Sequence, residues 1–140
     1  MRSINALNRD DKGAQGKKWV QVKSAKTALA TVGAGALTAD MLLSGLIMRT
    51  GPTGAYADTT ATGAEIVAAM GEGVEVGDSF DFIHVNGVAY ACTLTAGATG
   101  VTLAGTTANA ASKVRLYRCT VTAVGASPAV TITGIGEMVA

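Results

Sequence analysis

The stretch DSFDFIHVNGVAYACTLTA, residues 78–96, contains two β-rich runs separated by Asn-Gly at 86–87. Asn-Gly between such runs favours a two-residue type I′ turn, so the stretch predicts an antiparallel β-hairpin. In that register the two faces of the hairpin carry Phe80, Phe82 and His84 on one side, and Ile83, Val85, Val88, Tyr90, Cys92 and Leu94 on the other. Because both faces are largely apolar, we expect both to be covered, by a short helix or by a second subunit.

Further short β-rich runs follow this hairpin, separated by turns that contain glycine. The segments CTLTAGATGVTLAG, residues 92–105, and CTVTAVGASPAVTITG, residues 119–134, resemble each other and predict a repeated strand-turn-strand unit. Between them KVRLYRCTV, residues 113–121, changes its hydrophobic phase, which predicts a β-bulge near Tyr117 and Arg118. Many short strands with frequent turns are typical of an antiparallel β-sandwich or β-barrel, and we predict this mainly β fold class.

One segment before the hairpin has a helical pattern. In TGAEIVAAM, residues 62–70, Thr62 and Glu65 stand at capping-box spacing and the larger apolar residues fall on one face. This segment predicts one short α-helix over residues 63–70. The preceding run, LTADMLLSGLIMRTG, residues 37–51, predicts an entry turn and an apolar strand from Leu42 to Arg49.

The 140-residue chain has a net charge of +1, but its charges are unevenly distributed. Residues 1–27 hold seven basic and two acidic residues, which gives +5, whereas the rest holds four basic and eight acidic residues, which gives −4. The length suits a single core, and the first residues lack a sustained apolar period. We therefore predict an extended basic N-terminal arm over residues 1–36 and a β-rich domain over residues 37–140 in a soluble protein with no membrane partner.

The residues capable of catalysis or metal binding do not combine into a recognisable site. His84 is the only histidine, and the predicted hairpin register places Asp81 and Cys92 on the face opposite to it. Acidic residues recur at positions 72, 75, 78 and 81, but this spacing alternates faces in an extended chain and lacks the calcium-loop pattern. Cys92 and Cys119 lie in β-like runs outside any zinc motif, so we expect buried free thiols. We predict no catalytic, metal or cofactor site, no small-molecule substrate and no enzyme activity.

The basic arm carries the only tryptophan of the chain, within GKKWVQVKSAK, residues 16–26. Lysines near one aromatic residue could bind nucleic acid, by neutralising phosphates and stacking a base on Trp19. They also suit a protein surface, because tryptophan anchors interfaces, valines allow strand addition and lysines attract an acidic partner. The single aromatic residue and the lack of an RGG-like or recognition-helix pattern favour the protein surface over nucleic acid. The residues assigned to this contact are Lys17, Lys18, Trp19, Val20, Val22, Lys23 and Lys26.

Three longer segments resemble the β-rich domain of tailed-bacteriophage virion proteins. These segments are LTADMLLSGLIMRTGPTGAYADTTATGAEIVAAM, VEVGDSFDFIHVNG and CTLTAGATGVTLAGTTANAASKVRLYRCTVTAVGASPAVTI, and they cover residues 37–134. The resemblance rests on the order of an apolar strand with RTG, an Ala-rich helix, VGDSFDF, the Asn-containing hairpin, TGVTLAG and VRLYRCTVT. Members of this family are capsid decoration (cement) proteins and related head-surface or fibre-base proteins. The basic arm lies outside the resemblance.

The resemblance implies a capsid decoration protein on the capsid surface of the virion, assembled in the host cytoplasm. Its partner would be the major capsid protein, whose neighbouring subunits it would bridge and so stabilise. The resemblance also implies self-association, often as a homotrimer, and the two apolar hairpin faces lead us to expect Phe80, Phe82 and His84 at the subunit contact. The alternatives are a head-fibre, tail or baseplate component of the same virion, a nucleic-acid-binding protein that uses the basic arm, and a small hydrolase built on His84.

Overall fold

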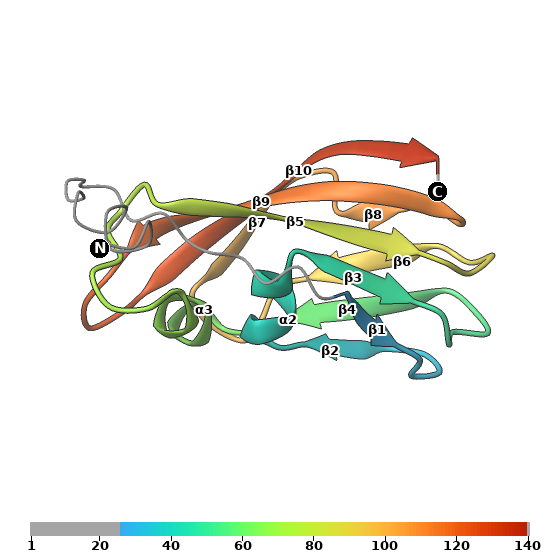
Figure 1. Ribbon diagram of the computed structural model, residues 1–140, viewed down its shortest axis with the longest axis horizontal. Helices are drawn as coiled ribbons and strands as arrows, with labels where there is room; N and C mark the ends of the chain where they lie inside the picture. Colours follow the sequence, from blue (N-terminus) through green and yellow to red (C-terminus); the bar gives the residue numbers. More distant parts are fainter. Residues whose placement is uncertain (1–25, 140) are drawn as a thin grey trace, which may run out of the picture.

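The computed structural model describes residues 26–139, which form two β-sheets and two short helices (Figure 1). In chain order the elements are β1 (Thr27–Leu29), β2 (Gly35–Leu37), α2 (Ala39–Ser44), β3 (Leu46–Arg49), β4 (Tyr56–Thr60), α3 (Gly63–Met70), β5 (Ser79–Asn86), β6 (Cys92–Thr95), β7 (Val101–Gly105), β8 (Ala108–Asn109), β9 (Lys113–Ala123) and β10 (Ala129–Val139). In this part of the chain, neither helix has the length and apolar character needed to span a membrane.

The large sheet has six strands in the order β1-β3-β5-β9-β10-β7, and the small sheet has four in the order β2-β4-β6-β8. From β1 to β8, successive strands alternate between the two sheets. Each of these connections carries the chain across to the other sheet, and from β1 to β6 this makes strands two apart in the sequence neighbours that run in the same direction. Accordingly β1, β3 and β5 are parallel, and so are β2, β4 and β6.

The predicted antiparallel β-sandwich or β-barrel is wrong in its strand pairing. The described chain is mainly β, but its two sheets are mixed and largely parallel. We had assigned the glycine-containing turns to hairpins, whereas most of them lead from one sheet to the other. In the second copy of the internal repeat, β9 and β10 do form an antiparallel hairpin. In the first copy, β6 and β7 belong to different sheets, and β7 instead pairs in parallel with β10.

Asn86 and Gly87 do not form the predicted hairpin turn. The strand before them, β5, pairs with β3 and β9, whereas β6 pairs with β4 and β8 in the other sheet. A type I′ turn requires positive φ at both central residues, and neither Asn86 nor Gly87 has it. Glycine is needed here for space, because a Cβ at Gly87 would lie 2.8 Å from the carbonyl oxygen of Arg49.

The helix predicted over residues 63–70 is confirmed as α3, and its capping box is present. The Glu65 amide donates to Thr62 Oγ1 at 3.2 Å, and the Thr62 amide donates to Glu65 Oε2 at 3.1 Å. The strand expected from Leu42 to Arg49 is only half correct, because its first residues belong to α2, a helix that the sequence did not predict. Thr38 caps the start of α2, and Gly45 ends it in the left-handed region at φ 87°.

The helices and the small sheet meet different halves of the inner face of the large sheet. The helix α3 contacts β10, and α2 contacts β3 and β5 (Figure 1). The side chains buried in this half are apolar, and we call it the apolar half: Leu42, Ile66, Phe80, Cys119, Val121, Val130 and Ile132. Between this half and the small sheet, the ring of Phe82 stacks on that of Tyr117 with centroids 5.1 Å apart. Beyond these rings the interior becomes polar.

Candidate functional site

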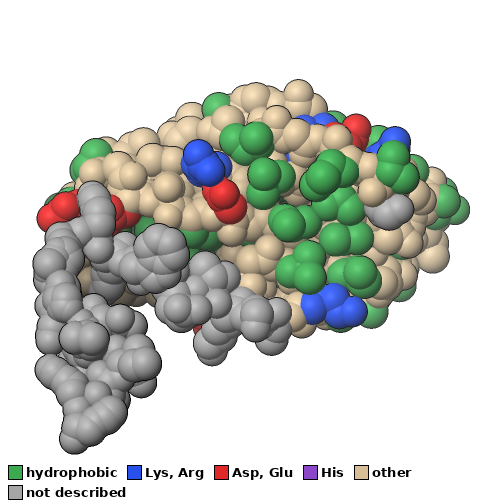
Figure 2. Space-filling view, turned by 45° about the horizontal axis from the view of Figure 1, so that its top comes forward, with side chains coloured by type: hydrophobic (Ala, Val, Ile, Leu, Met, Phe, Trp, Pro, Cys, Tyr) green, Lys and Arg blue, Asp and Glu red, His purple; other side chains and the backbone are tan. Residues whose placement is uncertain are grey.

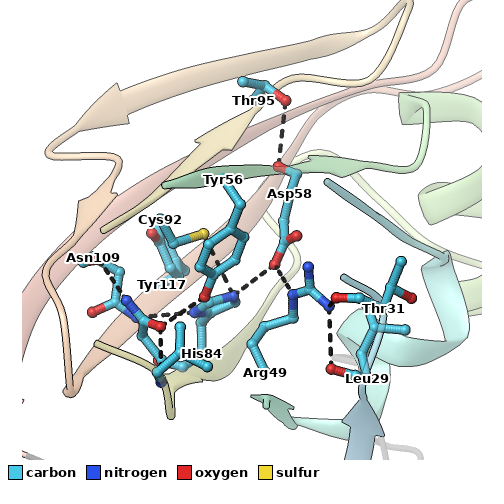
Figure 3. Close-up of polar contacts among 12 residues, drawn as sticks. Leu29, Thr31, Arg49, Tyr56, Asp58, His84, Cys92, Thr95, Asn109 and Tyr117 are labelled. Carbon is cyan, nitrogen blue, oxygen red and sulfur yellow. Dashed lines mark hydrogen bonds and ion pairs between the residues drawn. The ribbon is translucent and has the colours of Figure 1, made fainter. Parts of the chain in front are cut away.

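Seven polar or potentially reactive side chains meet between the two sheets, beside the C-terminal end of β5 (Figure 3). This polar cluster comprises Arg49, Tyr56, Asp58, His84, Asn86, Cys92 and Asn109, each at most 7% exposed. Three of the residues come from β3 and β5 of the large sheet, and four come from β4, β6 and β8 of the small sheet. The cluster therefore joins the two sheets through polar contacts, where a β-sandwich usually has an apolar core.

Arg49 is the cation of the cluster and also its main link to the β1–β2 connection. Its Nε lies 3.0 Å from Asp58 Oδ2, and both side chains are fully buried. Nη1 donates to the carbonyl oxygens of Leu29 at 3.1 Å and Thr31 at 3.2 Å, and Nη2 donates to that of Gly33. The guanidinium carbon also lies 4.8 Å from the centroid of the Tyr56 ring, in a cation–π contact. One buried side chain thus fixes a loop and both sheets.

His84 is held by hydrogen bonds on both of its ring nitrogens. Asn109 Nδ2 donates to the His84 carbonyl oxygen at 3.0 Å, which orients the amide so that the same nitrogen faces His84 Nδ1 at 2.9 Å. Nδ1 must then accept, so the ring proton is on Nε2, which donates to Asp58 Oδ2 at 2.9 Å. This geometry describes a neutral imidazole beside an Arg49–Asp58 ion pair.

Asn86 makes the densest set of hydrogen bonds in the cluster. Its Oδ1 accepts from the Tyr56 hydroxyl at 2.7 Å, and its Nδ2 donates to the carbonyl oxygens of Tyr90, Asn109 and Ala110 at 2.8 to 3.0 Å. Burial raises the pKa of the Tyr56 phenol far above its usual value, so the hydroxyl remains a donor. Asn86, which the sequence predicted in a hairpin turn, is therefore a buried residue that links the two sheets by hydrogen bonds.

Asp58, His84 and Cys92 are the residue types of an orienting acid, a base and a nucleophile, but Asp58 and Cys92 both face the same ring nitrogen of His84, Nε2. The distance from Cys92 Sγ to His84 Nε2 is 3.9 Å. However, burial, together with the negative charge of Asp58, raises the pKa of the Cys92 thiol to about 12. The Nε2 atom that would have to accept the thiol proton already carries its own proton. Cys92 is 2% exposed, so the arrangement is a protonated, enclosed cysteine and not an activated nucleophile.

The same three residues are the one group of side chains within residues 26–139 spaced for a metal ion. Asp58 Oδ2, His84 Nε2 and Cys92 Sγ all lie within 4.8 Å of one another, and zinc accepts these ligand types. Binding would require removal of the Nε2 and thiol protons. It would also bring a dication next to the Arg49 guanidinium, which already pairs with Asp58 Oδ2. The hydrogen-bonded arrangement accounts for these atoms better than a metal site does.

The structure places the residues expected at the subunit contact inside the chain. Phe80, Phe82 and His84 are 5%, 0% and 1% exposed, so one chain does not present them on its surface. We had based that expectation on a hairpin that does not exist. The outward side chains of β5 are instead on its other face, at Ile83 and Val85. Both cysteines are free and buried, as we had predicted.

The residues assigned to the basic arm fall mostly outside the described part of the chain. Lys17, Lys18, Trp19, Val20, Val22 and Lys23 precede residue 26, and Lys26 is exposed. Residues 27–37, which we had included in the arm and the entry to the domain, contain β1 and β2. These strands pair with β3 and β4, so the two sheets begin earlier in the chain than the predicted boundary at residue 36.

Comparisons of the chain with protein-family profiles, curated proteins and solved structures found no match.

Sequence reasoning did not find the polar cluster, and it wrongly separated His84 from Cys92. The separation followed from the hairpin register, which places the two residues on opposite faces. A usable signal was present in YADTT, residues 56–60, where a charged residue occupies the same phase as the buried Tyr56 and Thr60. A carboxylate at an inward position of a strand requires a buried cation or donor nearby, but the sequence does not show which one.

Proposed function

We propose that this chain is a structural protein of a tailed-bacteriophage virion, a capsid decoration protein that binds the outer surface of the major capsid shell and bridges its subunits. The observation that carries the proposal is that the polar cluster is enclosed and its reactive groups are used within the fold. The histidine and both cysteines are engaged within the fold, which favours a function of the protein surface over catalysis by these groups. The sequence resemblance to phage virion proteins then favours a role in particle structure over the small hydrolase built on His84.

The distribution of charge supports a protein partner over nucleic acid. Residues 1–27 carry a net charge of +5, whereas the remainder carries −4. An acidic body is repelled by phosphates, while the basic N-terminal residues attract an acidic protein surface and speed the encounter with it. We propose that residues 17–26, with Trp19 as the apolar anchor, make this contact with the major capsid protein.

Cryo-electron microscopy of virions of the phage that encodes the chain tests the location. We expect density for the two-sheet body on the outside of the capsid, present in hundreds of copies. Density at a tail, baseplate or head fibre, in tens of copies, would replace the decoration role with the alternative virion role. Absence from the purified particle would contradict both.

A binding assay with purified capsids tests the basic residues. The full chain, a variant that lacks residues 1–25 and the Trp19→Ala variant are compared at physiological salt. We expect both changes to weaken capsid binding while the circular dichroism spectrum of the body is unchanged. Equal binding by all three proteins would remove the basic residues from the contact. Salt-dependent binding of the full chain to DNA would then favour the nucleic-acid role.

A further inference from the structure

Along the strands of the large sheet, the apolar residues move from the inner face to the outer face. In the first part of β5 the inward residues are Phe80 and Phe82, and the outward residues are Ser79 and Asp81. In its last part the inward residues are His84 and Asn86, and the outward residues are Ile83 and Val85. The outer surface is thus polar over the apolar half of the interior and apolar over the polar cluster.

The neighbouring strand β9 changes at the same level. Its outward residues are Arg118 and Thr120 in one part and Val114 and Leu116 in the other. The change of hydrophobic phase that we had attributed to a bulge in β9 is this reversal. The pairing of β5 with β9 is continuous through it, and the register shift lies on β10 between Gly134 and Gly136.

The outward apolar residues form two rows across four strands. Leu46, Ile83 and Leu116 are paired across β3, β5 and β9, and Met48, Val85, Val114 and Met138 are paired across β3, β5, β9 and β10. We call these seven side chains the outer patch. Figure 2 shows hydrophobic side chains gathered over this side of the molecule, with few charged groups among them. Six of the seven are half-buried, and Met138 is 53% exposed.

We infer that the outer patch is an interface between copies of this chain. With strands about 4.8 Å apart and outward residues about 7 Å apart along each strand, the patch covers roughly 300 Å². A stable dimer buries about 800 Å² per partner, with an apolar centre and a polar rim. The patch has the size of such a centre, and the threonine-rich part of the same face, with Thr102, Thr120, Thr131 and Thr133, can supply the rim.

Charge selects a second copy over the other possible occupants. The outer patch contains no charged residue, and the nearest pair across β5 and β9, Asp81 and Arg118, is already joined at 2.8 Å. The basic N-terminal residues would find no anionic partner on the patch. A second copy brings an equally uncharged apolar surface, so two patches can face each other without burying an unpaired charge.

The free edge of β10 is continuous with this surface. Its partner β7 ends at Gly105, opposite Gly134, so within the described chain residues 136–139 pair only with β9, and Ile135 lies at the register shift. Ile135, Met138 and Val139 are 52%, 53% and 77% exposed along this stretch. An exposed strand edge with apolar side chains is a surface that proteins normally cover, and a second copy placed on the patch reaches it.

Sedimentation of the full chain across micromolar concentrations tests the inference. The measurement needs no capsid, so its outcome is independent of whether the proposed capsid-binding function is correct. The test variant Met48→Lys/Met138→Lys adds two charges to the outer patch with little change in side-chain length. The matched control, Thr59→Lys/Thr93→Lys, adds the same charges to exposed positions on the outer face of the small sheet. Circular dichroism and cooperative thermal unfolding check the fold, and Met138→Lys alone is used if the double variant is unfolded.

We expect the wild-type chain and the control to sediment as the same oligomer. The test variant should be a folded monomer, or associate more than about 30-fold more weakly, because each new charge would be buried in an apolar centre. A monomeric wild-type chain, or an oligomer that the patch variant leaves intact, would overturn the inference. If the wild-type chain is monomeric and removal of residues 1–25 increases binding of a hydrophobic dye, the chain's own N-terminal residues cover the patch.

Discussion

The apolar half of the interior and the polar cluster are built on the same strands but depend on different forces. In the apolar half, α2 contacts β3 and β5, α3 contacts β10, and the buried side chains are apolar. In the polar cluster, side chains of β3 and β5 meet side chains of the small sheet, and the contact runs through an ion pair and hydrogen bonds. Apolar burial is non-directional, whereas the cluster needs each donor to face its acceptor. The polar cluster therefore sets the position of one sheet relative to the other.

This difference predicts how each part responds to damage. An apolar core loses stability in proportion to the contacts removed. A buried polar network loses much more when one member is removed, because the remaining partner stays desolvated and unpaired. Within residues 26–139, Asp58 Oδ1 and Asn109 Oδ1 already have no hydrogen-bond partner, so the cluster has little capacity to absorb another loss.

The largest effect is expected for Arg49→Met. The change leaves the Asp58 carboxylate buried without its cation and releases the carbonyl oxygens of Leu29 and Thr31. We expect a loss of about 3–5 kcal/mol in the free energy of unfolding, measured by urea denaturation. The matched control is Arg118→Met, which breaks the exposed pair with Asp81 and should change the midpoint little. Equal losses of stability for the two variants would mean that the buried Arg49–Asp58 pair contributes no more to folding than the exposed Arg118–Asp81 pair.

The apolar half should respond less steeply. Ile132 is fully buried on β10, and Ile132→Ala should lower the free energy of unfolding by about 2–4 kcal/mol through lost burial and the cavity that remains. Ile135→Ala lies three residues away on the same strand at a position that is 52% exposed, and it should cost less than about 0.5 kcal/mol. A loss for Ile132→Ala larger than that for Arg49→Met would reverse the proposed order of the two regions.

The two cysteines provide a pH test with one thiol in each region. Burial raises the pKa of both Cys92 and Cys119 from 9.0 to about 12. Above pH 9 the unfolded chain releases protons that the folded protein retains, so stability should fall as the pH rises from 9 towards 12, and these thiols contribute no pH dependence below 9. Between these two pH values the slope should approach about 1.4 kcal/mol per pH unit for each thiol.

Urea denaturation at a series of pH values measures this slope, and Cys92→Ala or Cys119→Ala should each make it shallower. A slope that neither variant changes would show that the thiols are not protected from ionisation in the folded protein.

The smallest effect is expected from zinc. His84 Nε2 and the Cys92 thiol both carry protons, and the Asp58 carboxylate is paired with Arg49. Excess zinc at neutral pH should therefore leave the thermal midpoint unchanged. The Cys92→Ala variant is the control for zinc binding elsewhere. A rise of several degrees in the wild-type protein that Cys92→Ala abolishes would instead identify the three residues as a metal site.

Some local signals in the sequence predicted local structure correctly. The Thr62 and Glu65 spacing predicted α3 because a capping box is completed within one turn of helix. The β-rich composition predicted a mainly β chain, and the position of the two cysteines in β-like runs predicted buried free thiols. Each of these features depends on residues close together in the chain, whose interactions are the same in any fold that contains them.

Strand pairing and the polar cluster were decided by the tertiary structure. Asn-Gly is compatible with a hairpin, but here Asn86 makes hydrogen bonds with three carbonyl oxygens and a tyrosine hydroxyl, and these contacts accompany the crossing of the chain to the other sheet. His84 and Asp58 are 26 residues apart in the sequence and 2.9 Å apart in space. Alternation along β5 correctly grouped Phe80, Phe82 and His84 on one face. Which face was buried depended on the partners above and below the sheet, and residue spacing within one strand carries no information about them.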